Sequence, residues 1–197
     1  MAEPRETSVV IPAFNESGGI ERTIEGLKDR GFAEIMVVDD GSSDDTADRA
    51  RAAGARVVRH PYNKGNGAAV KTGIREAGSP VILLMDADTQ HDPAEALRLI
   101  GPIGDYDMVI GARSLSDQSF VRAMGNAIFR GLASWLTGRE IPDLTSGYRA
   151  AKREALLEVL HLLPNGFSYP TTSCLSLMKS GRSVLFAQPL AILRVPQ

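Results

Sequence analysis

Short apolar runs alternate with longer amphipathic segments through the first half of the chain. The apolar runs are rich in Val, Ile and Met, and they predict strands at residues 7–11, 35–39, 56–59, 81–85 and 108–112. The segments between them predict helices at residues 17–30, 44–53, 67–77 and 93–100. Strands buried on both faces that alternate with helices indicate βαβ units and a mainly parallel sheet. The sequence therefore predicts an α/β sandwich.

The second half of the chain is less regular. A polar loop at residues 114–119 leads into a long helix at 120–136, and residues 143–149 resemble a loop with a short strand. Two further helices at 152–160 and 171–180 precede a last strand at 184–186. No internal repeat, linker or low-complexity tract interrupts the pattern, so we expect one domain over residues 1–197.

Composition agrees with one folded domain of 197 residues, since 43% of the residues are hydrophobic and 23% are charged. The single cysteine, Cys174, excludes an internal disulfide and a zinc site made of several thiolates. No secretory signal is visible, and no apolar stretch reaches the roughly 18 residues that span a bilayer. We therefore expect a soluble or peripheral chain.

Charge is distributed unevenly within the total of −2. Residues 1–100 carry a net charge of −5, whereas residues 101–197 carry a net charge of +3. This asymmetry either arises by chance or suits one end to cations and the other to anions. A nucleic-acid-binding domain would be much more basic, so nucleic acid is not an expected partner.

Acidic side chains follow the predicted strands at the edge where ligands gather in open α/β sheets. They are Glu16 after the first strand, Asp39 and Asp40 at the end of the second, and Asp86 and Asp88 after the fourth. Each one alone is compatible with a helix cap or a solvated turn. Together they predict a ligand site at the carboxyl edge of the sheet.

Asp86 and Asp88 are candidate metal ligands. Alternate residues of an extended segment point the same way, so both carboxylates would face one site with Ala87 turned from it. Two adjacent carboxylates repel each other unless one is protonated or a cation lies between them. Oxygen ligands suit Mg²⁺ or Mn²⁺, Gln90 is placed to add a carbonyl oxygen, and His91 is a weaker candidate.

The glycine-rich segment at residues 63–73 resembles a phosphate-binding loop that enters a helix. It lacks the ending of a P-loop, and Val70 stands where the dinucleotide fingerprint requires its third glycine. These departures exclude the kinase and dehydrogenase interpretations. The alternative is that the glycines only permit a tight turn and close helix packing.

Three other features have a functional and a structural interpretation. Arg113 ends the fifth strand, where it would bind a phosphate or form a surface ion pair. Asp143 would act as a general base or bind an acceptor, with Arg149 as an anion contact, unless both belong to a capped turn. The helix at 120–136 carries an apolar stripe that is either core or a contact with a membrane surface.

Six segments taken together resemble the family 2 glycosyltransferases, and among them the polyprenyl-phosphate glycosyltransferases. Their order and spacing carry the resemblance, since each motif alone is weak. The segments are residues 10–16, 37–46, 63–67, 85–90, 111–113 and 145–149.

The resemblance implies a GT-A fold, which is a three-layer α/β/α sandwich, and inverting transfer of a sugar from a GDP- or UDP-sugar. Asp88, Arg113 and Asp143 are the expected catalytic residues, and Asp86, Asp88 and Gln90 are the expected ligands of Mg²⁺ or Mn²⁺. The nucleotide-sugar would contact Pro12, Ala13, Phe14, Asn15, Glu16, Val38, Asp40, Lys64, Asp86, Ala87, Asp88 and Arg113.

The acceptor implied by the resemblance is a polyprenyl phosphate, at the cytoplasmic face of a membrane. A lipid phosphate is already ionised at neutral pH and needs no base, whereas a hydroxyl acceptor would need Asp143. Relatives usually continue beyond the last strand into a basic segment and membrane helices, so we expect this chain to lack that part. Transfer to a hydroxyl acceptor and a non-catalytic nucleotide-sugar-binding module are the alternatives. The nucleotidyltransferase interpretation fails because residues 12–16 replace its glycine-rich loop.

Overall fold

The computed structural model describes residues 1–87, 93–113 and 143–190. The predicted helix at 120–136 and the predicted metal ligands Asp88 and Gln90 lie outside the described residues.

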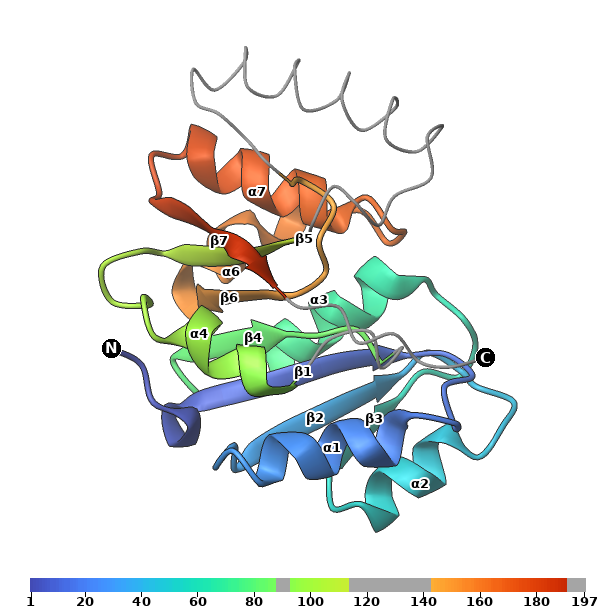
Figure 1. Cartoon of the computed structure of the whole chain (residues 1–197). Coiled ribbons are helices and arrows are strands. Elements are labelled where there is room, and N and C mark those ends of the chain that lie inside the picture. The colour runs from blue at the N-terminus through green and yellow to red at the C-terminus, as the bar shows by residue number, and fades with distance from the viewer. Residues whose placement is uncertain (88–92, 114–142, 191–197) are drawn as a thin grey trace.

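Seven strands form one sheet in the order β3-β2-β1-β4-β6-β5-β7 (Figure 1). Their bounds are β1 Thr7–Ala13, β2 Glu34–Asp39, β3 Arg56–Arg59, β4 Val81–Leu84, β5 Met108–Arg113, β6 Arg149–Lys152 and β7 Val184–Leu190. β6 runs antiparallel to both of its neighbours, β4 and β5, whereas the other pairs are parallel. The expected mainly parallel sheet is therefore confirmed, with one reversed strand in its interior.

Helices cover both faces of the sheet. Their bounds are α1 Ile20–Lys28, α2 Thr46–Ala52, α3 Asn66–Glu76, α4 Ala96–Ile100, α6 Arg153–Val159 and α7 Tyr169–Lys179, with 3₁₀ helices η1 Pro4–Glu6, η2 Pro93–Glu95 and η4 Leu160–Leu162. The predicted helices that fall within the described residues match these elements except for their ends. The first begins at Ile20 instead of Ser17, because the Gly19 and Ile20 N–H groups bond to Glu16 in a turn that precedes the helix.

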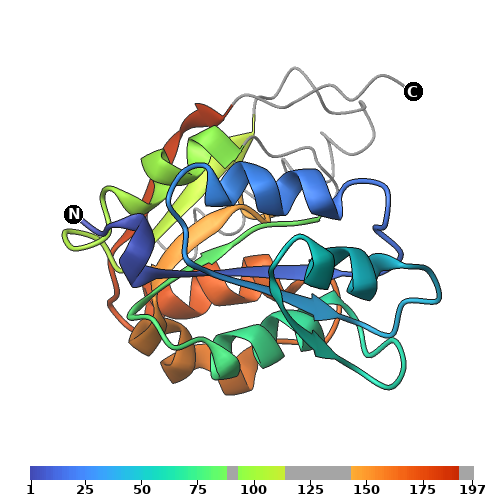
Figure 2. The same cartoon turned by 90° about the horizontal axis from the view of Figure 1, so that it is seen from below.

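Two apolar clusters, one on each face, hold the three layers together. α1, α2 and α4 pack with Val9 and Ile11 of β1, and α3, α6 and α7 pack with Val10 of the same strand. Successive residues of a strand point to opposite faces, so β1 contributes to both clusters. Figure 2 shows α1 and α3 on opposite sides of the sheet.

α3 lies very close to β1 because it carries a glycine at the contact. A Cβ at Gly73 would come within 2.2 Å of the Val10 Cγ1, so no larger residue fits there without a shift. This contact fixes the depth of α3 against the sheet, and α3 begins at the edge where the candidate site lies. Within the described residues, no helix combines the length and the apolar character needed to cross a membrane.

Candidate functional site

The loop after β1 is tied to the loop after β2 by side-chain hydrogen bonds. The N–H of Asn15 donates to the Ser42 Oγ at 2.9 Å, and the Asn15 Oδ1 accepts from the Ser43 N–H at 2.9 Å. Asn15 adopts a φ of 56°, in the left-handed region that asparagine tolerates better than most residues. The Glu16 N–H donates to the Thr46 Oγ1 at 2.8 Å. Asn15 thus shapes this edge of the sheet.

Asp39 and Asp40 are adjacent in sequence, but they have different surroundings. Asp39 is fully buried, its Oδ1 accepts from the Ser42 N–H at 2.9 Å, and its Oδ2 lies 3.0 Å from the Arg59 Nε. Asp40 is 3% exposed, and its two oxygens accept from the N–H groups of Lys64 at 3.0 Å and Gly65 at 2.7 Å. Asp39 therefore caps a turn, whereas Asp40 organises the loop that leads to α3.

The glycines of that loop serve close packing. A Cβ at Gly65 would lie 2.4 Å from the carbonyl oxygen of Asn165, and one at Gly67 would lie 2.2 Å from that of Pro164. The N–H of Ala68 donates to the Asn165 carbonyl at 3.1 Å. These contacts favour the structural interpretation of the glycine-rich segment, because the start of α3 is occupied by the chain at residues 164–166.

A pocket of about 320 Å³ opens at the carboxyl edge of β1 and β4. Seven of the residues predicted to contact a nucleotide-sugar line it, namely Pro12, Ala13, Phe14, Glu16, Asp40, Asp86 and Ala87. Asn63, Gly65, Asn66, Ala69 and Phe167 complete the lining. Phe14 is 45% exposed and Phe167 is 84% exposed, so two aromatic rings with free surface border the opening. We call this cavity the carboxyl-edge pocket.

Three predicted contacts lie elsewhere. Val38 is fully buried in the cluster beneath α3, and Asn15 and Lys64 are exposed side chains outside the lining. The Lys64 Nζ lies 5.6 Å from the centre of the Tyr62 ring, and the Lys64 backbone bonds Asp40. Asn15 and Lys64 thus connect to the carboxyl-edge pocket through its supporting loops.

Asp86 is closely confined by Gly147. A Cβ at position 147 would lie 2.1 Å from the Asp86 Oδ2, so only glycine leaves the carboxylate in its place. Ala87 also lines the pocket, although strict alternation would turn it away. The difference arises because β4 ends at Leu84, so the alternation of a strand does not extend to Asp86 and Ala87.

Arg149 lies in the interior. Its guanidinium contacts oxygen atoms of the protein itself, which does not support the expected role as an anion contact. Its guanidinium is fully buried and donates to the carbonyl oxygens of Ser146 and Pro170, the latter at 2.8 Å, and to the Ser173 Oγ at 2.9 Å. Burial lowers the pKa of Arg149. Electrostatic attraction to Tyr169, Cys174, Asp143 and Asp86 raises this pKa and offsets part of the effect of burial. Arg149 thus holds the loop that carries Gly147.

Asp143 and Arg113 belong to the same edge of the sheet by topology. The Asp143 carboxylate is 6% exposed, and its Oδ1 accepts from the Thr145 N–H at 2.8 Å in a tight turn before β6. β5 runs parallel to β4, since both are antiparallel to β6, so Arg113 ends β5 at the carboxyl edge. Asp143 is not among the described residues that line the carboxyl-edge pocket.

The described residues supply one of the three expected metal ligands. Asp86 places a carboxylate on the carboxyl-edge pocket, and Mg²⁺ and Mn²⁺ prefer such oxygen donors. Among residues 1–87, 93–113 and 143–190, no three or more His, Cys, Asp or Glu side chains gather to hold a metal ion. Asp86 fits as one ligand, and Asp88 and Gln90 lie outside the described residues.

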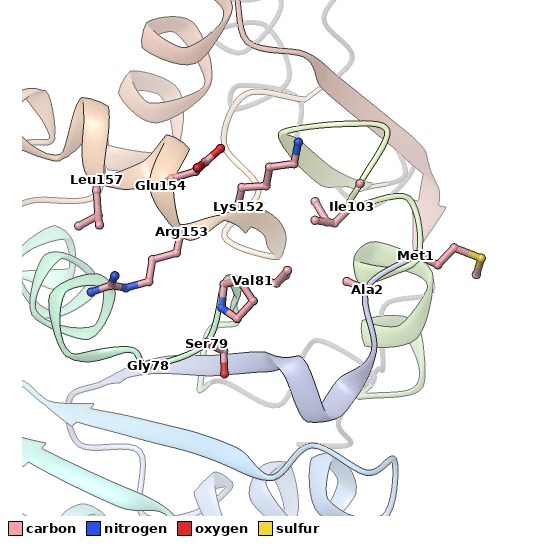
Figure 3. Close-up of a pocket in the computed structure, with 12 residues that line it drawn as sticks. Met1, Ala2, Gly78, Ser79, Val81, Ile103, Lys152, Arg153, Glu154 and Leu157 are labelled. Carbon is pink, nitrogen blue, oxygen red and sulfur yellow. The ribbon is translucent and has the colours of Figure 1, made fainter.

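A second pocket, of about 680 Å³, is larger but lies at the opposite edge of the sheet. Figure 3 shows it between the start of β4, the end of β6 and the N-terminal residues, with Ser79, Lys152 and Leu157 in its lining. Parallel α/β sheets bind ligands at their carboxyl ends, so position favours the smaller pocket.

Sequence reasoning missed Asn66 and Phe167 in the pocket lining, Gly147, which confines Asp86, and His60, whose Nδ1 lies 2.6 Å from the Asp40 Oδ1. His60 follows β3 directly, so the strand-end rule applied to the third strand would have found it. Phe167 and Gly147 come close to the carboxyl-edge pocket only through contacts between distant segments, and no local pattern indicates such contacts.

These features define an α/β protein with a mainly parallel sheet and a pocket at its carboxyl edge, which is where ligands generally bind in this class of fold. The family model of glycosyl transferase family 2 matches residues 8–160. The chain belongs to this family, its fold is the GT-A fold, and it is a glycosyltransferase.

Relatives and solved structures agree with this placement. An uncharacterized protein of Methanocaldococcus jannaschii is 37% identical over 79% of this chain and 68% of its own. Dolichol-phosphate mannosyltransferase of Pyrococcus furiosus is 34% identical over 82% of this chain, which spans 50% of that enzyme. The crystal structure of glucosyl-3-phosphoglycerate synthase of Mycobacterium tuberculosis with Mn²⁺ and UDP-glucose has a TM-score of 0.74 and 27% identity, covering 96% of this chain and 72% of that chain.

Proposed function

We propose that residues 1–197 form one catalytic domain that transfers a sugar, with inversion, from a GDP- or UDP-sugar to a polyprenyl phosphate. The observation that carries this proposal is the carboxyl-edge pocket, where seven residues expected to contact a nucleotide-sugar come together from three separate segments. The relative from Pyrococcus furiosus is a dolichol-phosphate mannosyltransferase, which supports the lipid acceptor.

The carboxyl-edge pocket would hold the nucleotide part of the donor. Pro12, Ala69 and the ring of Phe14 offer apolar contacts to a base, and Asp40 offers a carboxylate oxygen to its N–H groups. Asp86, with Asp88 and Gln90, would hold Mg²⁺ or Mn²⁺. When bound, such an ion neutralises the charge of a diphosphate.

Asp86 and Arg113 approach the diphosphate from different strands in this proposal. Asp86 follows β4, where Gly147 leaves room for its carboxylate, and Arg113 ends β5 at the same edge. A guanidinium suits a phosphate because two of its N–H groups can bond two oxygens at once. Arg113 would therefore stabilise the negative charge that grows on the leaving diphosphate.

A lipid phosphate would attack without help from a protein base. Its second pKa lies near 6 by analogy with other phosphate monoesters, so it is mostly a dianion at neutral pH. The acceptor would be reached at the cytoplasmic face of a membrane, with the chain in peripheral contact.

A second candidate function is transfer to a soluble acceptor that carries its own phosphate. The solved neighbour from Mycobacterium tuberculosis is a glucosyl-3-phosphoglycerate synthase, and it matches 96% of this chain. A hydroxyl acceptor needs a base, and Asp143 is the first candidate because its carboxylate precedes β6 near Gly147.

Donor binding is tested by calorimetry with UDP-glucose and GDP-mannose, each with and without Mn²⁺. One of them should bind with a dissociation constant that Mn²⁺ lowers, and Asp86→Asn should remove the metal dependence. The control is Leu157→Gln in the pocket at the opposite edge, which should bind as the unchanged chain does. Failure of both donors to bind would refute the proposed donor site.

The acceptor is tested with the donor that binds, carrying a labelled sugar. Incubation with undecaprenyl phosphate or dolichyl phosphate in detergent should move label into a lipid fraction that mild acid releases. Label that enters 3-phosphoglycerate instead would favour the second candidate, and Asp143→Asn would then abolish transfer. Donor binding without transfer to either acceptor would indicate a non-catalytic nucleotide-sugar-binding module.

A further inference from the structure

His60 is a buried histidine that connects three elements beside the carboxyl-edge pocket. It follows the end of β3 and is 6% exposed. Its Nδ1 lies 2.6 Å from the Asp40 Oδ1, and its Nε2 lies 2.9 Å from the Thr72 Oγ1 on α3. The ring therefore joins the end of β3 to the end of β2 and to α3, which lie together in Figure 1.

The direction of these hydrogen bonds follows from their chemistry. An ionised carboxylate oxygen only accepts, so the proton of the short contact is carried by the His60 Nδ1. In a neutral ring, the Nε2 then accepts from the Thr72 hydroxyl. Both ring nitrogens are thus satisfied, and the plane of the ring is fixed from two sides.

The same Asp40 carboxylate holds the loop that forms one wall of the pocket. It accepts from the N–H of Lys64 at 3.0 Å and from the N–H of Gly65 at 2.7 Å. Asp40, Gly65 and Asn66 all line the carboxyl-edge pocket. The orientation of one carboxylate therefore affects both a polar group of the pocket and the backbone that precedes α3.

We propose that His60 is a positioning residue for the donor nucleotide: it orients the Asp40 carboxylate and, through it, the Lys64–Gly65 backbone. This inference rests on the proposed function, in which the carboxyl-edge pocket holds the nucleotide. His60 does not line that pocket, so it acts through Asp40 and does not touch the nucleotide. A buried carboxylate that loses one of three donors can rotate toward other partners, and the pocket wall then loses its fixed shape.

A direct test follows the backbone amides that Asp40 holds. Hydrogen exchange by NMR should show the Lys64 and Gly65 amides exchanging about tenfold faster in His60→Ala, because the carboxylate that accepts from them is no longer fixed. His60→Asn, which restores a donor near the position of Nδ1, should recover most of the protection. Thr72→Val frees only the far side of the ring and should have a smaller effect. The matched control is His161→Ala, which removes an exposed histidine on η4.

The functional test is titration with UDP and with GDP in the presence of Mn²⁺. His60→Ala should lower the affinity for whichever of the two nucleotides the unchanged chain binds by about tenfold. This is the order expected from losing one hydrogen bond. In an Asp40→Ala background the same substitution should weaken binding less than about twofold, because residues that act as a unit are not additive. In a transfer assay the effect should appear in the KM for the donor, with kcat and the KM for the acceptor preserved.

Two results would overturn the inference. One is unchanged exchange of the Lys64 and Gly65 amides in folded His60→Ala and Thr72→Val. The other is that His60→Ala lowers nucleotide affinity as much in the Asp40→Ala background as it does in the otherwise unchanged chain. If the unchanged chain binds neither UDP nor GDP, the proposed function fails, and the amide exchange still decides whether His60 positions Asp40.

Discussion

Gly147 is the residue on which the place of Asp86 most clearly depends. A methyl group there would lie 2.1 Å from the Asp86 Oδ2, far inside the contact distance of the two atoms, so the carboxylate must move in Gly147→Ala. We expect nucleotide binding in the presence of Mn²⁺ to weaken at least about tenfold, since one ligand of the proposed metal site is displaced. Calorimetry against UDP and GDP measures this.

The control for that prediction is Gly18→Ala, which adds a methyl group at the same edge of the sheet where no atom lies within 4 Å. It should bind as the unchanged chain does. Equal affinity of Gly147→Ala and Gly18→Ala would show that the Asp86 carboxylate contributes nothing to binding.

Cys174 is expected to be unreactive in the folded chain. Burial raises the pKa of its thiol to about 11, although attraction to Arg149 acts in the opposite direction. Only the thiolate reacts with disulfide reagents, so at pH 8 the thiol should react about a hundredfold more slowly in the folded chain than in the denatured one. The rate at which dithiobis(nitrobenzoate) releases its coloured thiolate tests this. Equal rates for the folded and the denatured chain would contradict it.

Asp39 and Asp40 illustrate which part of the site could be predicted. The strand-end rule correctly indicated that the acidic groups after β2 lie at the carboxyl edge of the sheet, because the direction of a parallel strand fixes where it ends. The rule does not indicate that Asp39 meets Arg59 while Asp40 faces the pocket. That difference depends on β3 and on the loop before α3, whose positions no local pattern contains.

The contact between α3 and residues 164–166 joins elements that are far apart in sequence. Gly67→Ala would place a methyl group 2.2 Å from the Pro164 carbonyl oxygen, which is backbone and cannot rotate away. We expect the free energy of unfolding to fall by about 1–3 kcal/mol, as in other overpacked contacts. Urea unfolding monitored by circular dichroism measures the loss.

A suitable control for this prediction lies in the same contact region. Gly166→Ala adds a methyl group where no atom lies within 4 Å, so its unfolding midpoint should stay close to that of the unchanged chain. If both variants unfold at the same urea concentration, residues 164–166 adjust freely and do not determine the position of α3.

Strands and helices of the first half were predictable because their patterns are local. β1, β2 and β4 are buried along most or all of their length, so apolar runs mark them directly. β6 was less apparent, since the central residues of Arg149–Lys152 are two alanines, which have little preference for strands. Its reversed direction depends on pairing with β4 and β5, which sequence periodicity does not encode.

The carboxyl-edge pocket joins the two halves of the chain. Residues 12–14, 16, 40 and 86–87 come from the first half, while Phe167 and the glycine that confines Asp86 come from the second. The acidic excess of residues 1–100 is only partly a property of this pocket, because Asp39 is paired with Arg59 and Asp44 is bonded to Thr46 and Ser17. Charge asymmetry alone therefore overstates how much negative potential the pocket presents.

Stability toward acid should depend on Asp107, which connects three strands of the second half. Its Oδ2 accepts from the N–H and the Oγ of Ser183, both at 2.9 Å, and its Oδ1 lies 3.1 Å from the Lys152 Nζ. Burial alone would raise the pKa of Asp107, but these hydrogen bonds and the lysine lower it to about 2. The folded chain therefore binds a proton at this group more weakly than the unfolded chain does.

The sign of the pH dependence follows from that difference. A carboxyl group whose pKa is lowered by folding stabilises the fold above its unfolded pKa, near 3.8, and loses this contribution as the pH falls toward 2. The shift corresponds to about 2 kcal/mol at neutral pH. Asp107→Asn should therefore lose about 2 kcal/mol at pH 7 and much less at pH 2 relative to the unchanged chain. Urea unfolding across this range, with the exposed Asp105→Asn as control, tests it. A deficit that is constant from pH 7 to pH 2 would show that the loss comes from packing and not from the ionised carboxylate.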